Sequence, residues 1–217
     1  MNKLKVLYDV VTVMKNKEAF NGILTVQVHK DEESLFFLQN EFEKNLLTGE
    51  TKAKINTDLN YEGKTLKHES TTEFTMLHSG ECKCHEFFRN LHQCHAAGCG
   101  GLRGKLAKLA FAFSILNALQ VSEQDSKTIV LSLKSSDLPE DIKALIHEKM
   151  SQASTCHHEH GFLKEFCVTE QRDFGLNIFI NKNFEAEKIV IALSGLQNAE
   201  QNAPRKLTAR AEVSFTW

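Results

Sequence analysis

The sequence predicts an α+β domain with a curved, half-barrel-like antiparallel sheet, helices packed on one face of it, and a Cys/His-rich loop. Apolar and polar residues alternate with a period of two over much of the chain, which is typical of strands with one buried face. Only three stretches show helical spacing, and strands do not alternate with helices as a parallel sheet requires. The 217 residues, 41% of them hydrophobic, fit one domain over 1–217. The segment 78–101 interrupts it as a loop between two strand-rich halves.

The first half of the chain opens with a helix and continues with strands. Residues 3–17 place apolar side chains on one helical face, and these are Leu4, Leu7, Val10, Val11 and Met14. Strands are expected over 22–29 and 33–42. Residues 52–61 and 64–75 alternate cleanly on either side of Glu62-Gly63, which predicts a hairpin with one face toward a core and one toward water.

The second half begins with a helix and returns to strands. A helix is expected from Leu102 to about Leu119, with an apolar stripe of Leu102, Leu106, Leu109, Phe113 and Leu116. A strand follows over 127–134. Asp137-Leu138-Pro139-Glu140 resembles a capping box and opens a helix to about Met150, with Ile142, Leu145, Ile146 and Met150 facing inward. Strands are expected over 174–180, 187–195 and 207–217, with a break at Asn202-Ala-Pro204.

The helix-then-meander order, with the ending Phe-Ile-Asn-Lys-Asn (179–183) and Lys-Ile-Val-Ile-Ala-Leu (188–193), resembles the LolA/LppX-like lipoprotein-carrier fold. The resemblance implies a sheet curled into a half-barrel with helices inside its concave face. It also implies that a lipid or acyl chain could be held there.

Composition excludes several classes of partner. The chain carries 26 Lys and Arg against 28 Asp and Glu, so no excess of positive charge points to nucleic acid. No run approaches the roughly 20 apolar residues of a membrane span. Asp9, Thr12 and Lys15 interrupt the apolar N-terminal stretch, which does not match a secretory signal. We therefore expect a soluble, cytoplasmic protein without a transmembrane segment.

Cysteine and histidine are concentrated in two short stretches, 78–99 and 156–160. Five of the six cysteines and seven of the ten histidines lie there. Thiolate and imidazole are the ligands that borderline and soft metals prefer, so we expect a metal site. Its first-choice ligands are the four cysteines of the first stretch. The candidate ligands are Cys82, Cys84, His85, Cys94, His95, Cys99, Cys156, His157, His158 and His160.

The metal hypothesis leaves its metal and its role open. Zinc suits mixed thiolate and imidazole ligands, and nickel or copper are the alternatives. The ion would act as a structural clip, or the protein would sense, buffer or deliver it. A loop with incidental metal affinity and a redox hairpin between cysteines are competing explanations.

The alternative function is a carrier or binding protein for a lipid or other apolar ligand in a half-barrel cavity. Catalysis is not expected, because the sequence contains no nucleophile elbow, phosphate loop or dinucleotide fingerprint. His29, His68 and His147 are interpreted as surface or strand-face residues rather than ligands, and Cys167 as a small buried hydrophobe.

Overall fold

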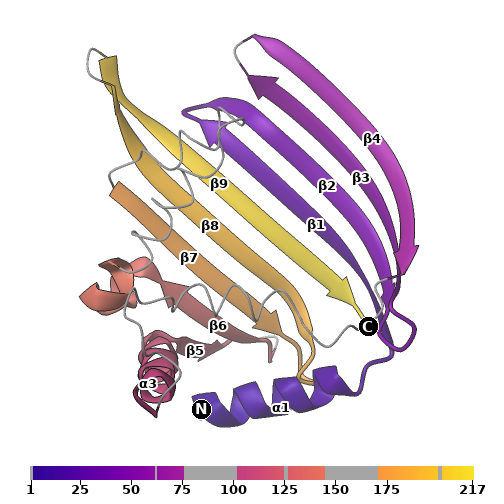
Figure 1. The fold of residues 1–217 in the computed structure, drawn as a ribbon, viewed down its shortest axis with the longest axis vertical. Helices are drawn as coiled ribbons and strands as arrows, with labels where there is room; N and C mark the ends of the chain where they lie inside the picture. The colour runs from indigo at the N-terminus through magenta and orange to yellow at the C-terminus, as the bar shows by residue number, and fades with distance from the viewer. Residues whose placement is uncertain (1, 62, 76–101, 125–126, 145–170, 200–201) are drawn as a thin grey trace.

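A computed structural model describes residues 2–61, 63–75, 102–124, 127–144, 171–199 and 202–217 (Figure 1). Strands dominate it, and the described elements follow in chain order. They are α1 (Lys3–Lys15), β1 (Ala19–Lys30), β2 (Glu33–Asn45), β3 (Glu50–Tyr61), β4 (Lys64–Thr75), α3 (Leu102–Ala118), β5 (Gln120–Glu123), β6 (Ile129–Lys134), the 3-10 turn η1 (Ser135–Asp137), β7 (Gln171–Ile180), β8 (Ala186–Ala199) and β9 (Asn202–Thr216).

The strands form one curved antiparallel sheet in the order β4-β3-β2-β1-β9-β8-β7-β6-β5 (Figure 1). The first four strands and the last five each run as a meander. The two meanders join where β1, the first strand of the chain, pairs with β9, the last one. The prediction of a strand-rich, antiparallel α+β fold is confirmed at this level, while the predicted Cys/His loop lies outside the described residues.

Helix α1 packs on β6 and β7 through a face centred on Val6, which is buried together with Ile180 and Leu131. Leu7 and Val10 flank it on this face, as predicted. The prediction was wrong for Leu4 and Val11, which were expected on the buried face of the helix but are at least half exposed. The side chain of Asn2 caps the helix by accepting hydrogen bonds from the backbone N–H groups of Leu4 and Lys5.

Helix α3 also packs against this core, and the residues described as packing there are not those of the predicted stripe, whose members Leu102, Leu106 and Leu109 have side chains outside the described part of the structure. Phe111, Ile115 and Ala118 contact the core, whereas Phe113 is 51% exposed. The helix is apolar on several sides (Leu-Ala-Phe-Ala-Phe-Ser-Ile-Leu), so periodicity alone does not decide which face is buried.

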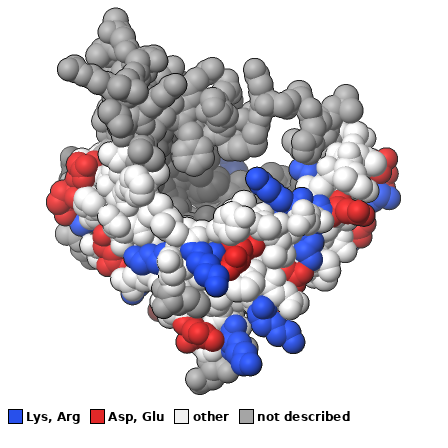
Figure 2. Space-filling model, turned by 90° about the horizontal axis from the view of Figure 1, so that it is seen from below, with Lys and Arg blue, Asp and Glu red and all other residues white. Residues whose placement is uncertain are grey.

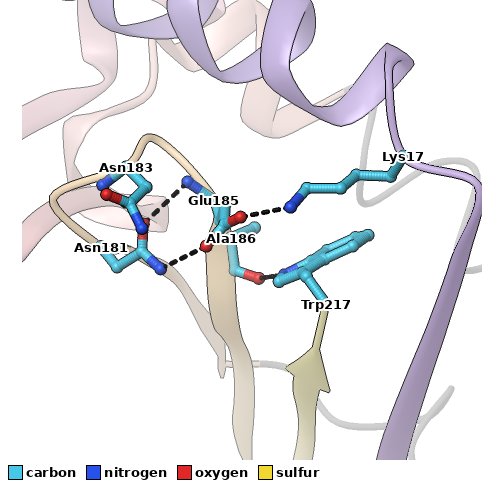
Figure 3. Close-up of polar contacts among 6 residues, drawn as sticks. All are labelled: Lys17, Asn181, Asn183, Glu185, Ala186 and Trp217. Carbon is cyan, nitrogen blue, oxygen red and sulfur yellow. Dashed lines mark hydrogen bonds and ion pairs between the residues drawn. The ribbon is translucent and has the colours of Figure 1, made fainter.

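A polar cluster fastens the end of α1 to the sheet (Figure 3). Lys17, just after α1, forms an ion pair with Glu185 in the turn between β7 and β8. The side-chain nitrogen of Asn181 donates to the other Glu185 oxygen at 2.8 Å. Trp217 donates its indole N–H to the carbonyl oxygen of Ala186 at 2.7 Å, with the Lys17 ammonium 5.8 Å from its ring centroid. The first helix, one turn and the last residue are therefore held together.

Two boundaries differ from the predictions. The expected break at Asn202-Ala-Pro204 was wrong, because β9 begins at Asn202 and includes Pro204. The β8–β9 register shifts between Gln197 and Ala199, opposite this segment. A bulge of this kind tolerates proline, which cannot donate a hydrogen bond to a regular β-ladder.

The helix predicted near Leu138 is preceded by η1, and residues 140–144 of it are described as helical. Of its predicted inward residues Ile142 is buried, and Leu145, Ile146 and Met150 lie outside the described residues.

Candidate functional site

The register aligns the alternating residues of all strands on two faces of the sheet. Directly opposed residues of an antiparallel pair project to the same face. Val26 opposes Leu38 on one side and Ala211 on the other. The row continues to Thr57 of β3 and Ile191 of β8. One face of the sheet is therefore apolar across strands that are remote in sequence, and we call it the apolar face.

The described helices cover only the β6–β7 part of this face. The main core joins buried residues of α1 and of strands β6 and β7, and the partly buried residues of α3 pack against it. On β7, the partly buried Leu176 and Ile178 also pack against it, and they oppose Ile191 and Ile189 of β8. Ile191 is still 42% exposed. The described helical cover thus ends near β8, although the apolar row continues to β2.

Packed clusters occupy the two ends of the β1–β2–β9 part of the face. At the α1 end, four aromatic rings meet with centroid distances of 5.4 to 5.9 Å, and Gly22 makes room for one of them. A Cβ at Gly22 would lie 2.4 Å from Cζ of Phe42, so glycine is needed for this close approach. The second cluster contains Val28, Leu35 and Leu207. The four aromatic residues are Phe20, Phe42, Phe215 and Trp217.

Five apolar residues lie between these clusters, and we call them the mid-face: Leu24, Val26, Leu38, Ala211 and Val213. All five are half-buried, whereas Val28, which belongs to the second cluster, is buried. None of them belongs to either of the two described core clusters. They form a short apolar floor on three adjacent strands.

Asn40 is the polar exception at the edge of the mid-face. It opposes Leu24 on β1 and Ile55 on β3. Its side-chain oxygen Oδ1 is buried and accepts no hydrogen bond from the residues that the structure describes. An unsatisfied buried acceptor costs free energy, so it favours any occupant that brings a donor to this position.

On the opposite face of the sheet, polar residues prevail on β1, β2 and β9, and we call it the polar face. At the end of the molecule that Figure 2 shows from below, acidic and basic side chains are likewise interspersed over the described residues. Glu212 illustrates this, because it forms ion pairs with both Arg210 and Lys188. These contacts, the hydrogen bond from Arg210 first, lower the pKa of Glu212 below its ordinary value.

This polar face has a hollow of about 390 Å³ where small residues lie on β7 and β8. Gly175 and Ala192 are opposite each other there, and a Cβ at Gly175 would meet open space. His29, Asp173 and Arg210 are among the lining residues. Since Arg210 is already paired with Glu212, the hollow is less suited to a charged ligand than its lining suggests.

Every predicted metal ligand lies outside the described residues. This applies to the six candidates between 82 and 99 and to the four between 156 and 160. Within the described ranges, no group of three or more His, Cys, Asp or Glu side chains is placed to hold a metal ion. His68 is exposed on β4, as predicted for a surface residue, and His29 is half-buried at the hollow. The metal site stays a prediction.

Comparisons with known proteins identify no family for this chain. No family and no curated protein matches it. Two solved structures found by the search are dehydratases. An N-terminal dehydratase from a difficidin assembly line is 11% identical, with 97% of this chain and 83% of that one covered and a TM-score of 0.16. An inactive mutant of the CurJ dehydratase, in complex with a compound, is 9% identical, with 99% and 81% covered and a TM-score of 0.13. At these scores the likeness carries no functional argument.

The apolar floor was only partly recognisable from the sequence. A strand was predicted over residues 22–29, but no inward-facing side was assigned to it. Asn40 gave no signal, because a single amide in an alternating strand is common on either face.

Among the described helices, none is long and apolar enough to cross a membrane.

Proposed function

We propose that this protein binds an elongated apolar ligand, of which an acyl chain is the simplest kind, on the mid-face. The observation that supports this is the half-buried apolar floor of β1, β2 and β9, which lies between two packed clusters and beyond the described helical core. The resemblance to lipoprotein carriers, drawn from the sequence, points to the same class of ligand.

The dimensions of the floor suit a chain-like ligand. From Gly22 to Val28 the β1 strand advances six residues, which at about 3.3 Å per residue is about 20 Å. Burial of apolar ligand surface contributes roughly 25 cal/mol per Å² before the costs of association, so a long chain gains more than a compact fragment. The orphan acceptor on Asn40 favours a ligand with a hydroxyl, amide or protonated carboxyl group.

A titration with a fluorescent fatty acid tests the proposal on one strand. Val26→Lys places a charge on the mid-face, whereas Gln27→Lys makes the same change on the next residue, on the opposite face. We expect the first variant to lose at least tenfold in affinity, since an unpaired ammonium is costly to bury, and the second to bind normally.

Ala211→Leu separates a binding defect from a folding defect. It adds apolar volume to the floor without adding charge, so it should weaken binding by filling the site while leaving the circular dichroism spectrum unchanged. Equal affinities for the wild type, Val26→Lys and Ala211→Leu would show that the ligand binds elsewhere or not at all.

A second proposal rests on the cysteine and histidine clusters. We propose that Cys82, Cys84, Cys94 and Cys99 bind a transition metal, with zinc first and nickel or copper as alternatives. Elemental mass spectrometry on untagged, reduced protein tests this directly. A near-integer content of one metal that is lost in the quadruple Cys→Ser variant would support a specific site, and a trace mixture of metals would refute it.

A further inference from the structure

Strand β4 is a long edge with exposed side chains. It ends the sheet order, and its described neighbour is β3 alone. Eleven of its twelve residues are exposed, including Leu66 at 63% and Phe74 at 42%. The predicted core face of this hairpin is therefore not buried on β4. The other edge, β5, has only four residues, which is a common protection against edge pairing.

The sequence of β4 is complementary to itself when it is read antiparallel about Ser70. In that register Lys67 opposes Glu73 of a second copy, and Leu66 opposes Phe74 of the second copy. Both pairs occur twice, because a two-fold axis relates the copies. An axis perpendicular to the sheet also keeps the apolar face of both copies on the same side. Opposite charges and apolar pairs facing each other stabilise antiparallel strands.

The adjacent strand extends this charge pattern. Within one chain Glu73 pairs with Lys52 at 3.2 Å, and Lys67 pairs with Asp58 at 3.5 Å. A dimer centred on Ser70 would therefore align Lys52, Glu73, Lys67 and Asp58 as one row of alternating charge across four strands. Each charge in the row has neighbours of opposite sign only.

Neighbouring registers are disfavoured by like charges. A two-fold pairing centred on Glu69 sets this carboxylate against its own copy. A pairing centred on Thr71 sets Glu69 against Glu73 of the other chain. Like charges directly opposite each other destabilise a strand pair. The edge thus favours one alignment and disfavours the two closest to it.

We propose that β4 is a dimerisation edge, at which two copies of this chain pair antiparallel about Ser70 and continue the nine-stranded sheet into a second copy. The occupant of the edge is a second copy because the charges complement the strand itself. This proposal is independent of ligand or metal binding.

Two charge-reversal variants provide the first test by sedimentation velocity. Lys67→Glu and Glu73→Lys alone each set like charges together twice in a homodimer, and we expect the dimer dissociation constant to rise at least about tenfold. An equimolar mixture restores both opposite-charge pairs in the heterodimer, so dimers should return. Wild type that stays monomeric at high micromolar concentration overturns the proposal, and so do single variants that dimerise like wild type.

Cysteine cross-linking then tests the register. Ser70→Cys brings two thiols directly opposite each other, whereas Thr72→Cys on the same face separates them by four residue steps, about 13 Å. Mild oxidation followed by peptide mass spectrometry should yield a peptide joined to its own copy at residue 70 only. A dimer without this cross-link, or equal cross-linking at both positions, overturns the proposed pairing.

Discussion

Replacing Glu185 by Gln tests how the end of α1 is fastened to the sheet. The Glu185 side chain is 17% exposed and its partner Lys17 is 25% exposed, so water screens the ion pair only partly. Glutamine keeps an acceptor for Asn181 but removes the charge. Hydrogen bonds to charged groups contribute about 1.5–3 kcal/mol, and residual exposure reduces this, so we expect a loss of about 1–2 kcal/mol in the free energy of unfolding near pH 7.

The effect should depend on pH with a defined sign. The hydrogen bond from Asn181, followed by that from Lys17, holds the pKa of Glu185 below its ordinary value of 4.5. The folded state therefore binds the proton less readily than the unfolded chain, and stability rises with pH between the two pKa values. The contribution is complete above about pH 4.5 and is lost as the pH falls through the folded pKa. The gap between wild type and Glu185→Gln should narrow over that range.

Urea unfolding near pH 7 and again between pH 4.5 and the acid limit of the native state measures this gap. Glu140→Gln is the matched control, because Glu140 also pairs with a lysine, Lys143 at 2.7 Å, but its side chain is 89% exposed. We expect the control to change stability by less than about 0.5 kcal/mol. A Glu185→Gln loss no larger than the control, or one independent of pH, would refute the reasoning.

Three further substitutions probe the core, the mid-face and the first helix cap. Ile180→Ala should cost about 2–5 kcal/mol in urea unfolding because Ile180 is fully buried, whereas Ile191→Ala, 42% exposed, should cost about 1 kcal/mol or less. Asn40→Leu removes the orphan acceptor and should raise the melting temperature of ligand-free protein, while Asn56→Leu on the opposite face should not. An unchanged or lower value for Asn40→Leu would contradict this interpretation. Asn2→Ala removes a helix cap and should cost about 1 kcal/mol, and an unchanged stability would show that the cap contributes nothing.

Local patterns predicted most strands because alternation records which side of a strand is buried. The hairpin strand at 64–75 has the predicted bounds. The short strand β5 was missed, since four residues are too few to show a period. The pairing of β1 with β9 was not predictable from either strand alone, because both alternate and many partners would satisfy them.

The candidate site was less predictable than the fold. The mid-face depends on which strands become neighbours, and the exposed edge depends on β4 being the last strand of the sheet. The apolar side of β4 looked like a core face in sequence, yet Leu66 and Phe74 stay exposed for this reason. The metal hypothesis has a strong compositional signal, but its ligands lie outside the described residues.

Photolabelling tests the central claim, ligand binding on the mid-face, most directly. A fatty acid with a photoreactive diazirine on its chain would be bound, irradiated and mapped by peptide mass spectrometry. Fragmentation of the labelled peptides assigns the label to single residues, and we predict labels on Val26, Leu38 and Ala211 and competition by unlabelled fatty acid. Labelling that resists competition, or that falls on the polar face around Gln27 and Arg210, would contradict the account.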